Sequence, residues 1–195
     1  MSDGNVGHQN ETRIHAIIWL RFAPTVTSVK RNQEVADMTD RIVKTIDLKA
    51  PVARVWRALA DHNEFGQWFR VKLDGPFEPG ALSTGRMTYP GYEHYPWHAV
   101  VERMEPERLF SFRWHHVDAK SGGNIAEQPS TLVEFLLEPT PEGTRLTITE
   151  SGFESIPAPR RLEILRGNTE GWNIQAGNIA DHLAINVSAK ASDGA

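Results

Sequence analysis

Glu150 and His116 are the residues whose types and places in the chain favour acid–base chemistry. Each ends a short segment in which apolar and polar residues alternate, and in a strand this alternation decides which way a side chain points. Glu150 follows Leu146 and Ile148 on one face, which puts a carboxyl group among apolar neighbours. A carboxyl group in such surroundings has a shifted pKa, and with a histidine nearby it supplies a general acid and base.

Each of these residues also has a structural interpretation. Glu150 either binds a hydroxyl or ammonium group of a ligand, or accepts hydrogen bonds from backbone amides where the strand turns toward Gly152, and we put the structural role first. A histidine at a strand end, such as His116, is more often hydrogen-bonded at a rim than catalytic. That Glu150 and His116 act as an acid–base pair is therefore a hypothesis, in which both side chains lie on one face of two strands.

Aromatic residues share that face. Segment 109–117 places one set on a single side, which we predict to point inward: Phe110, Phe112, Trp114 and His116. Segment 131–138 adds Phe135, and in segment 95–104 an inner set of Trp97, Ala99 and Val101 leaves His98 outside unless the register slips by one residue. The candidate ligand-binding residues are Trp68, Trp97, Phe112, Trp114, His116, Phe135, Glu150 and Trp172. Aromatic side chains on such faces also commonly form the core, and this alternative stays open.

Other chemistries lack support in the sequence. The chain has no Cys, and His115 and His116 face opposite sides of a strand, so they do not chelate one metal ion. His94 and His98 have a spacing that suits a helix rather than the strand assigned there. Ser151 and Ser155 lie outside any Gly-x-Ser-x-Gly elbow, and no strand–GxGxxG–helix unit is present. We predict no metal site and no cofactor.

Composition and charge restrict the partners. The chain has 195 residues and a net charge of -4 with scattered Lys and Arg, which argues against nucleic acid. The apolar run 14–22 is shorter than the ~20 residues of a membrane span, and it lacks a clean cleavage site for a signal peptide. The absence of Cys is compatible with a reducing compartment. We expect a cytoplasmic protein without a membrane span, and the sequence leaves a homodimer open.

The elements that would position these residues follow an α+β order. A strand over 42–48 precedes a helix that starts at Pro51 and runs to about Asp61, and a second helix, capped by Asp61 or Asn63, ends near residue 69. Strand-like segments follow at 81–89, 95–104, 109–117, 131–138 and 144–151, separated by Gly and Pro turn signals. A long terminal helix has the predicted apolar stripe Leu162, Leu165, Thr169, Trp172, Ala176, Ile179 and Leu183. We predict an antiparallel sheet with helices on one side.

The domain is expected to span residues 39–187. Residues 1–38 show no periodic pattern, and we expect them to be a leader outside the domain. Either Met38 is the natural start of the protein, or the leader is disordered. The alternative is an extra helix that covers one end of the sheet. Residues 188–195 form a tail that we expect to be disordered.

Several short motifs resemble the START-like, or SRPBCC, superfamily over roughly residues 39–185. They are Ala50-Pro51-x-x-x-Val55-Trp56, Phe65-x-x-Trp68, Pro90-Gly91-Tyr92-Glu93, Glu105-Pro106-Glu107-Arg108-Leu109, Thr149-Glu150-Ser151-Gly152-Phe153 and Gly171-Trp172. The branch most similar in these motifs comprises bacterial proteins named for similarity to the C-terminal domain of the activator of heat-shock protein 90 ATPase. The resemblance implies a helix-grip fold, in which a curved antiparallel sheet wraps a long terminal helix around an internal cavity.

The resemblance says less about activity, because the superfamily includes lipid carriers, hormone receptors and aromatic cyclases. We expect a protein that binds a small hydrophobic molecule, aromatic or acyl, rather than an enzyme. Two alternatives remain: a cavity enzyme of the cyclase or lyase type that uses Glu150 and His116, and a chaperone-regulating module that binds protein.

Overall fold

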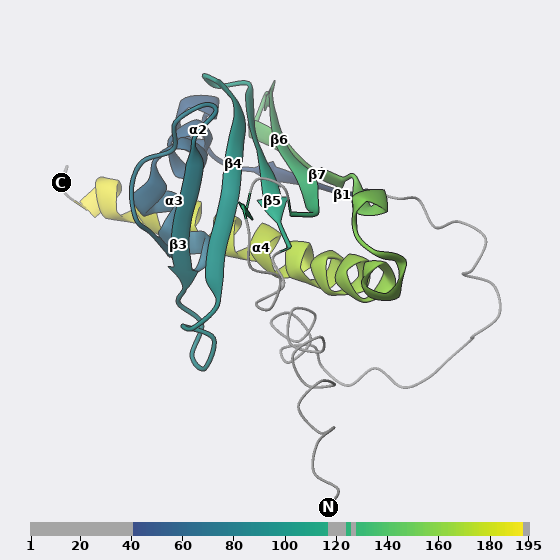
Figure 1. Ribbon diagram of the computed structural model, residues 1–195. Helices are drawn as coiled ribbons and strands as arrows, with labels where there is room; N and C mark the ends of the chain where they lie inside the picture. The colour runs from purple at the N-terminus through teal and green to yellow at the C-terminus, as the bar shows by residue number, and fades with distance from the viewer. Residues whose placement is uncertain (1–40, 117–123, 126–127, 193–195) are drawn as a thin grey trace, which may run out of the picture.

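The computed structural model describes residues 41–116, 124, 125 and 128–192 (Figure 1). Its elements, in chain order, are β1 Arg41–Leu48, α2 Val52–Ala60, α3 His62–Phe69, β2 Val71–Leu73, β3 Leu82–Met87, β4 Pro96–Glu105, β5 Leu109–His115, β6 Ser130–Thr140, β7 Gly143–Ser151, the 3-10 helix η2 Phe153–Ser155 and α4 Ala158–Ser192. The expected leader, residues 1–38, lies outside the described residues and stays a prediction. Helix α4 continues to Ser192, past residue 187, where we expected the domain to end.

The strands form one seven-stranded antiparallel sheet in the order β1-β7-β6-β5-β4-β3-β2. Strands β2 to β7 therefore follow the chain as a meander, and β1 joins at the far edge by pairing with β7. Helix α4 runs across the strands and contacts β1 directly, and α2 and α3 pack against both α4 and the sheet (Figure 1). This arrangement confirms the predicted helix-grip α+β fold.

The short helices begin where the sequence predicts. Pro51 precedes α2, and the Asp61 carboxylate accepts hydrogen bonds from the backbone N–H groups of Asn63 and Glu64 at 2.9 Å, which caps α3. Arg70 ends α3 in the left-handed conformation, with φ 65°. Strand β2 was not predicted, because three residues are too few for an alternating pattern to show.

The predicted inner face of the sheet is confirmed. Trp97, Ala99 and Val101 are at most 1% exposed, which settles the register of β4 with His98 on the outer face. The same face carries the buried residues Phe110, Phe112, Val133, Phe135, Leu137, Leu146 and Ile148. Glu150, at the end of β7, follows this alternation and is fully buried.

The predicted stripe of α4 is wrong at its N-terminal end. Leu162 is 40% exposed, and the residues that face the domain are Ile164, Asn168, Trp172, Gln175, Ile179 and Leu183. Two polar residues belong to this buried stripe because each has a buried partner, so a pattern read from apolar residues alone misses them. Asn168 donates to Glu150, and the Gln175 side chain donates to the backbone carbonyl of Phe69 at 2.9 Å.

Among the described residues, no helix is both long and apolar enough to cross a membrane.

Candidate functional site

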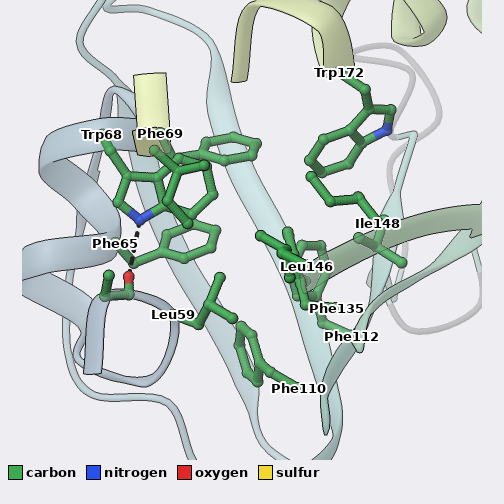
Figure 2. Packing of buried hydrophobic residues seen from close by; sticks show 14 of the residues in the cluster. Leu59, Phe65, Trp68, Phe69, Phe110, Phe112, Phe135, Leu146, Ile148 and Trp172 are labelled. Atoms are coloured by element: carbon green, nitrogen blue, oxygen red, sulfur yellow. Dashed lines mark hydrogen bonds between the residues drawn. The ribbon is translucent and has the colours of Figure 1, made fainter. Parts of the chain in front are cut away.

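Closely packed aromatic rings fill the space between α3 and the sheet (Figure 2). The Phe65 ring lies 4.9 Å from both Trp68 and Phe69, measured between ring centroids. Phe69 contacts Trp97 at 5.2 Å, and Trp97 contacts Phe112 at 5.3 Å. Contacts of this kind contribute about 0.5–1.5 kcal/mol each beyond the burial of apolar area. The rings therefore form the centre of the hydrophobic core.

Five of the eight predicted ligand-binding residues belong to this core. They are at most 2% exposed: Trp68, Trp97, Phe112, Phe135 and Trp172. Trp68 donates its indole N–H to the Ala58 carbonyl at 2.8 Å, drawn as a dashed line in Figure 2, and Trp97 donates to the Ser83 hydroxyl at 3.2 Å. Side chains thus occupy this part of the interior, and a direct contact between these residues and a ligand stays a prediction.

Glu150 is held by three side-chain donors. Thr131 of β6 donates its hydroxyl to Oε1 at 2.6 Å, and Asn168 of α4 donates its amide N–H to the same oxygen at 2.8 Å. Trp172 of α4 donates its indole N–H to Oε2 at 2.6 Å. Figure 2 shows the Trp172 indole nitrogen on the side away from the aromatic rings, which leaves it for the carboxylate. In the described part of the chain, the donors to Glu150 are side chains and not the backbone amides of our structural interpretation.

His116 extends this cluster toward the end of β5. Its Nε2 atom lies 3.0 Å from Thr131 Oγ1 and 3.9 Å from Glu150 Oε1. Thr131 has a single hydroxyl hydrogen, which it donates to Glu150, so the bond from His116 must run from Nε2–H to the hydroxyl oxygen. The geometry therefore assigns the proton-bearing nitrogen: His116 Nε2–H donates to Thr131, and Thr131 donates to Glu150. We call these three residues the polar chain.

Burial raises the pKa of the Glu150 carboxyl group above its ordinary value of 4.5, while the hydrogen bonds from Thr131, Trp172 and Asn168 lower it. The effect of burial on the pKa is larger than that of the hydrogen bonds, because the carboxyl group has no contact with solvent and desolvation disfavours the charged form. The result is a carboxylate that is fully hydrogen-bonded and yet has a heightened affinity for a proton.

Trp114 differs from the other predicted tryptophans. It faces inward from β5 but is only half-buried, whereas Phe110 and Phe112 on the same face are fully buried. Its indole N–H has no acceptor among the described residues. Its ring lies 5.6 Å from His116 and 6.3 Å from Trp172, so it stands directly beside the polar chain. The inner face is thus open to solvent at Trp114.

The sequence analysis missed Thr131 and Asn168. Thr131 shares the inner face with Val133 and Phe135, and Asn168 lies one helical turn before Trp172, but neither position shows in the sequence that its side chain contacts Glu150. We passed over them because they are uncharged polar residues, and only the position of Glu150 in the fold reveals them as its donors.

A second polar cluster joins the helices on the other side of α3. Glu64 accepts from Arg54 and Arg57 at 2.7 Å each, and His182 Nε2 lies 3.1 Å from the same carboxylate. Next to it is a surface pocket of about 280 Å³ that is lined by Gln67, Trp68, Arg70, Asn178, Asp181 and His182. Among the described residues, no group of three or more His, Asp or Glu side chains is arranged to hold a metal ion.

Solved structures similar to this one support the fold. MLL2253 from Mesorhizobium loti is 22% identical with a TM-score of 0.59, and the match covers 74% of this chain and 96% of that chain. NE0264 from Nitrosomonas europaea is 21% identical with a TM-score of 0.61, covering 78% of this chain and 99% of that one. DynU16, a protein of the dynemicin biosynthetic locus, is 25% identical with a TM-score of 0.58, covering 74% of this chain; the chain spans about half (47%) of DynU16.

Sequence comparison identifies the family. No protein with a curated description matches this chain. The sequence model of one family, described as Activator of Hsp90 ATPase homolog 1-like protein, matches residues 49–184. This range runs from the start of α2 through the buried part of α4 and so includes all the residues of the polar chain. The chain belongs to the family of Activator of Hsp90 ATPase homolog 1-like proteins.

Proposed function

We propose that the protein binds a small aromatic molecule, which stacks on Trp114 where the inner face of the sheet is open. The observation that carries this proposal is the contrast between Trp114 and the other inward-facing tryptophans. Trp68, Trp97 and Trp172 are buried and donate their indole N–H groups within the protein, whereas Trp114 is half-buried and has no acceptor among the described residues.

The surroundings of Trp114 support an aromatic ligand. Its ring lies 5.6 Å from Trp97 and 6.1 Å from Phe69, so its inner side is part of the aromatic core. A ligand ring that covers its exposed side extends this packing and removes apolar surface from water. The indole N–H of Trp114, for which residues 41–116, 124, 125 and 128–192 supply no acceptor, can give the ligand one directional hydrogen bond, as in small-molecule sites that are mostly apolar with few polar groups. Because rings already fill the interior beneath α3, the ligand is small and lies toward the end of β5.

The test is a titration of substituted benzenes and naphthalenes, followed by isothermal calorimetry and preceded by native mass spectrometry for a co-purifying ligand. Trp114→Ala removes the stacking surface, and we expect it to weaken binding about tenfold or more, equivalent to ~1.4 kcal/mol. Trp114→Phe keeps a ring and loses the N–H, so it should retain most of the affinity for ligands without an acceptor.

Trp56→Phe is the matched control, because Trp56 lies on α2 and is half-buried outside this site. We expect it to leave the affinity unchanged. Equal affinity of wild type and Trp114→Ala for every compound that binds would overturn the proposal.

A further inference from the structure

We propose that His98 and His115 together bind a divalent transition-metal ion of the zinc type on the outer face of the sheet. The site is separate from the proposed binding at Trp114, because successive side chains of β5 point to opposite faces and His115 follows Trp114 directly. The inference rests on two observations: a buried ring nitrogen of His115 that has a lone pair and no partner, and a second histidine that stands opposite it.

His115 presents a buried nitrogen that is ready to bind a cation. Its Nδ1 atom lies 3.2 Å from the backbone carbonyl oxygen of Gln128, and since a carbonyl oxygen only accepts, Nδ1 carries a proton and donates it. Burial, with a smaller effect from Arg113, lowers the pKa of His115 below 6.5, so the ring is neutral at pH 7 and Nε2 has a lone pair. The side chain is only 6% exposed, and among the described residues Nε2 has no hydrogen-bond partner.

His98 stands opposite His115 on the neighbouring strand β4. The register pairs Ala99 with Trp114, so the next position along each strand brings the two histidines face to face. Residues in such positions have Cβ atoms about 4.5–5.5 Å apart, which lets two imidazole rings reach one ion. Burial and the nearby His115 ring lower the pKa of His98 below 6.5. His98 is half-buried, and no residue in the described part of the chain forms a hydrogen bond with its ring.

The bond from His115 to a backbone carbonyl is the arrangement that orients metal-binding histidines. A histidine ligand usually donates its second ring N–H to a carbonyl or a carboxylate, which fixes the tautomer and leaves the other nitrogen for the metal. Neutral imidazole suits Zn²⁺, Cu²⁺ and Ni²⁺, whereas Mg²⁺ and Ca²⁺ need oxygen ligands. Two protein ligands leave coordination positions for water, so the site fits an exchangeable metal ion rather than a structural one.

The charges around the two histidines allow a cation to bind. Arg113 lies on the same face of β5, and its guanidinium forms an ion pair with Glu102 at 2.7 Å, which offsets its charge. The residues that pair with the two histidines from β3 and β6 are neutral: Thr84 and Ser130. The sequence analysis predicted no metal site because it compared histidines close together in the chain, whereas the register brings together two that are not.

A zinc titration of the full chain, purified without a histidine tag and followed by isothermal calorimetry, tests the site. We expect His98→Gln to weaken the binding of zinc tenfold or more. His115→Asn should do the same, because Asn keeps an N–H for the Gln128 carbonyl and removes Nε2. The double variant should lose little more than either single variant, since a single imidazole no longer chelates the ion. His94→Gln, at an exposed histidine before β4, is the matched control and should leave the affinity unchanged.

Nitrogen-15 NMR identifies the ring nitrogens that bind the metal. In the metal-free protein at pH 7 we expect the His115 proton on Nδ1, and on addition of zinc the His115 Nε2 resonance and one ring nitrogen of His98 should shift. The proposal is overturned if wild type does not bind zinc, if both single variants bind it as tightly as wild type, or if only other histidines shift. A proton on Nε2 of metal-free His115 would overturn it too. Melting curves show whether each variant folds, and the half-buried His98 supplies a decisive variant even if His115→Asn does not fold.

Discussion

Substituting Glu150 by Gln tests whether the carboxylate holds the fold together. Gln has the same shape but offers one oxygen and one NH2 group where Glu150 offers two oxygens. The oxygens of Glu150 have donors on both sides, with Thr131 and Asn168 at Oε1 and Trp172 at Oε2. Whichever way the amide turns, its NH2 group must therefore face at least one donor.

The expected loss of stability is worked out for the less costly orientation of the new amide group. With its oxygen toward Thr131 and Asn168, the new side chain keeps two hydrogen bonds in a weaker, uncharged form and places its NH2 group against the indole N–H of Trp172. Two buried donors then lack acceptors, at about 1–3 kcal/mol each, while the loss of a buried charge returns part of this. We expect Glu150→Gln to lower the free energy of unfolding at pH 7 by about 2–4 kcal/mol.

Urea denaturation followed by circular dichroism measures this change, with the slope of the transition checked for constancy. Glu134→Gln is the matched control: Glu134 lies on the outer face of β6, opposite Thr149, and should stay within about 0.5 kcal/mol of wild type. A loss below 1 kcal/mol for Glu150→Gln would refute the reasoning, because three buried donors cannot lose their charged acceptor without a cost of that size.

The remaining predictions concern pH, packing and the helix cluster. Because burial raises the pKa of Glu150, the folded protein keeps a proton that the unfolded chain releases above pH 4.5. The free energy of unfolding of wild type should therefore fall relative to that of Glu150→Gln as pH rises above 4.5. The slope is at most about 1.4 kcal/mol per pH unit, and it ends where the pH reaches the folded-state pKa. Trp172→Ala should cost about 3–5 kcal/mol in urea denaturation, since it removes a 2%-exposed ring and one donor to Glu150. Burial pushes the pKa of Glu64 up, but His182, Arg54 and Arg57 outweigh it and hold the pKa below 4.5. Glu64→Gln should therefore cost about 1–2 kcal/mol at pH 7, and the difference from wild type should shrink as pH falls through the folded-state pKa, as measured by thermal melts across pH.

The strands and their inner face were predictable because they depend on local patterns. Alternation along β5 and β7 needs only the residues of one strand, and Gly and Pro signals mark the turns between strands. Asp61 was predicted as a cap for the same reason, since its hydrogen bonds reach only two or three residues along the chain. Each of these features is determined within a few residues of where it appears.

The donors to Glu150 and the filled interior were beyond prediction because they depend on residues distant in the chain. Asn168 is buried on α4 because Glu150 stands opposite it, and Gln175 because the Phe69 carbonyl does, 106 residues away in sequence. A periodic pattern carries no sign of such partners, so the stripe of α4 was misplaced at Leu162. Whether rings leave a cavity also depends on how Phe65, Trp97 and Phe112 fit together, and no single strand determines that.

The pairing of β1 with β7 has a consequence for how the protein is made. Thr45 and Thr147 lie side by side on these strands although they are 102 residues apart in the sequence. On a ribosome that adds about 5–20 residues per second, β1 therefore waits roughly 5–20 s before its partner strand exists. The hairpins β3–β4, β4–β5, β5–β6 and β6–β7 can each form as soon as their own residues emerge, because their contacts are local. Within the described part of the chain, the strand synthesised first is thus the last to be paired, and until then its apolar residues Ile42 and Leu48 are open to chaperones or to pairing with other chains.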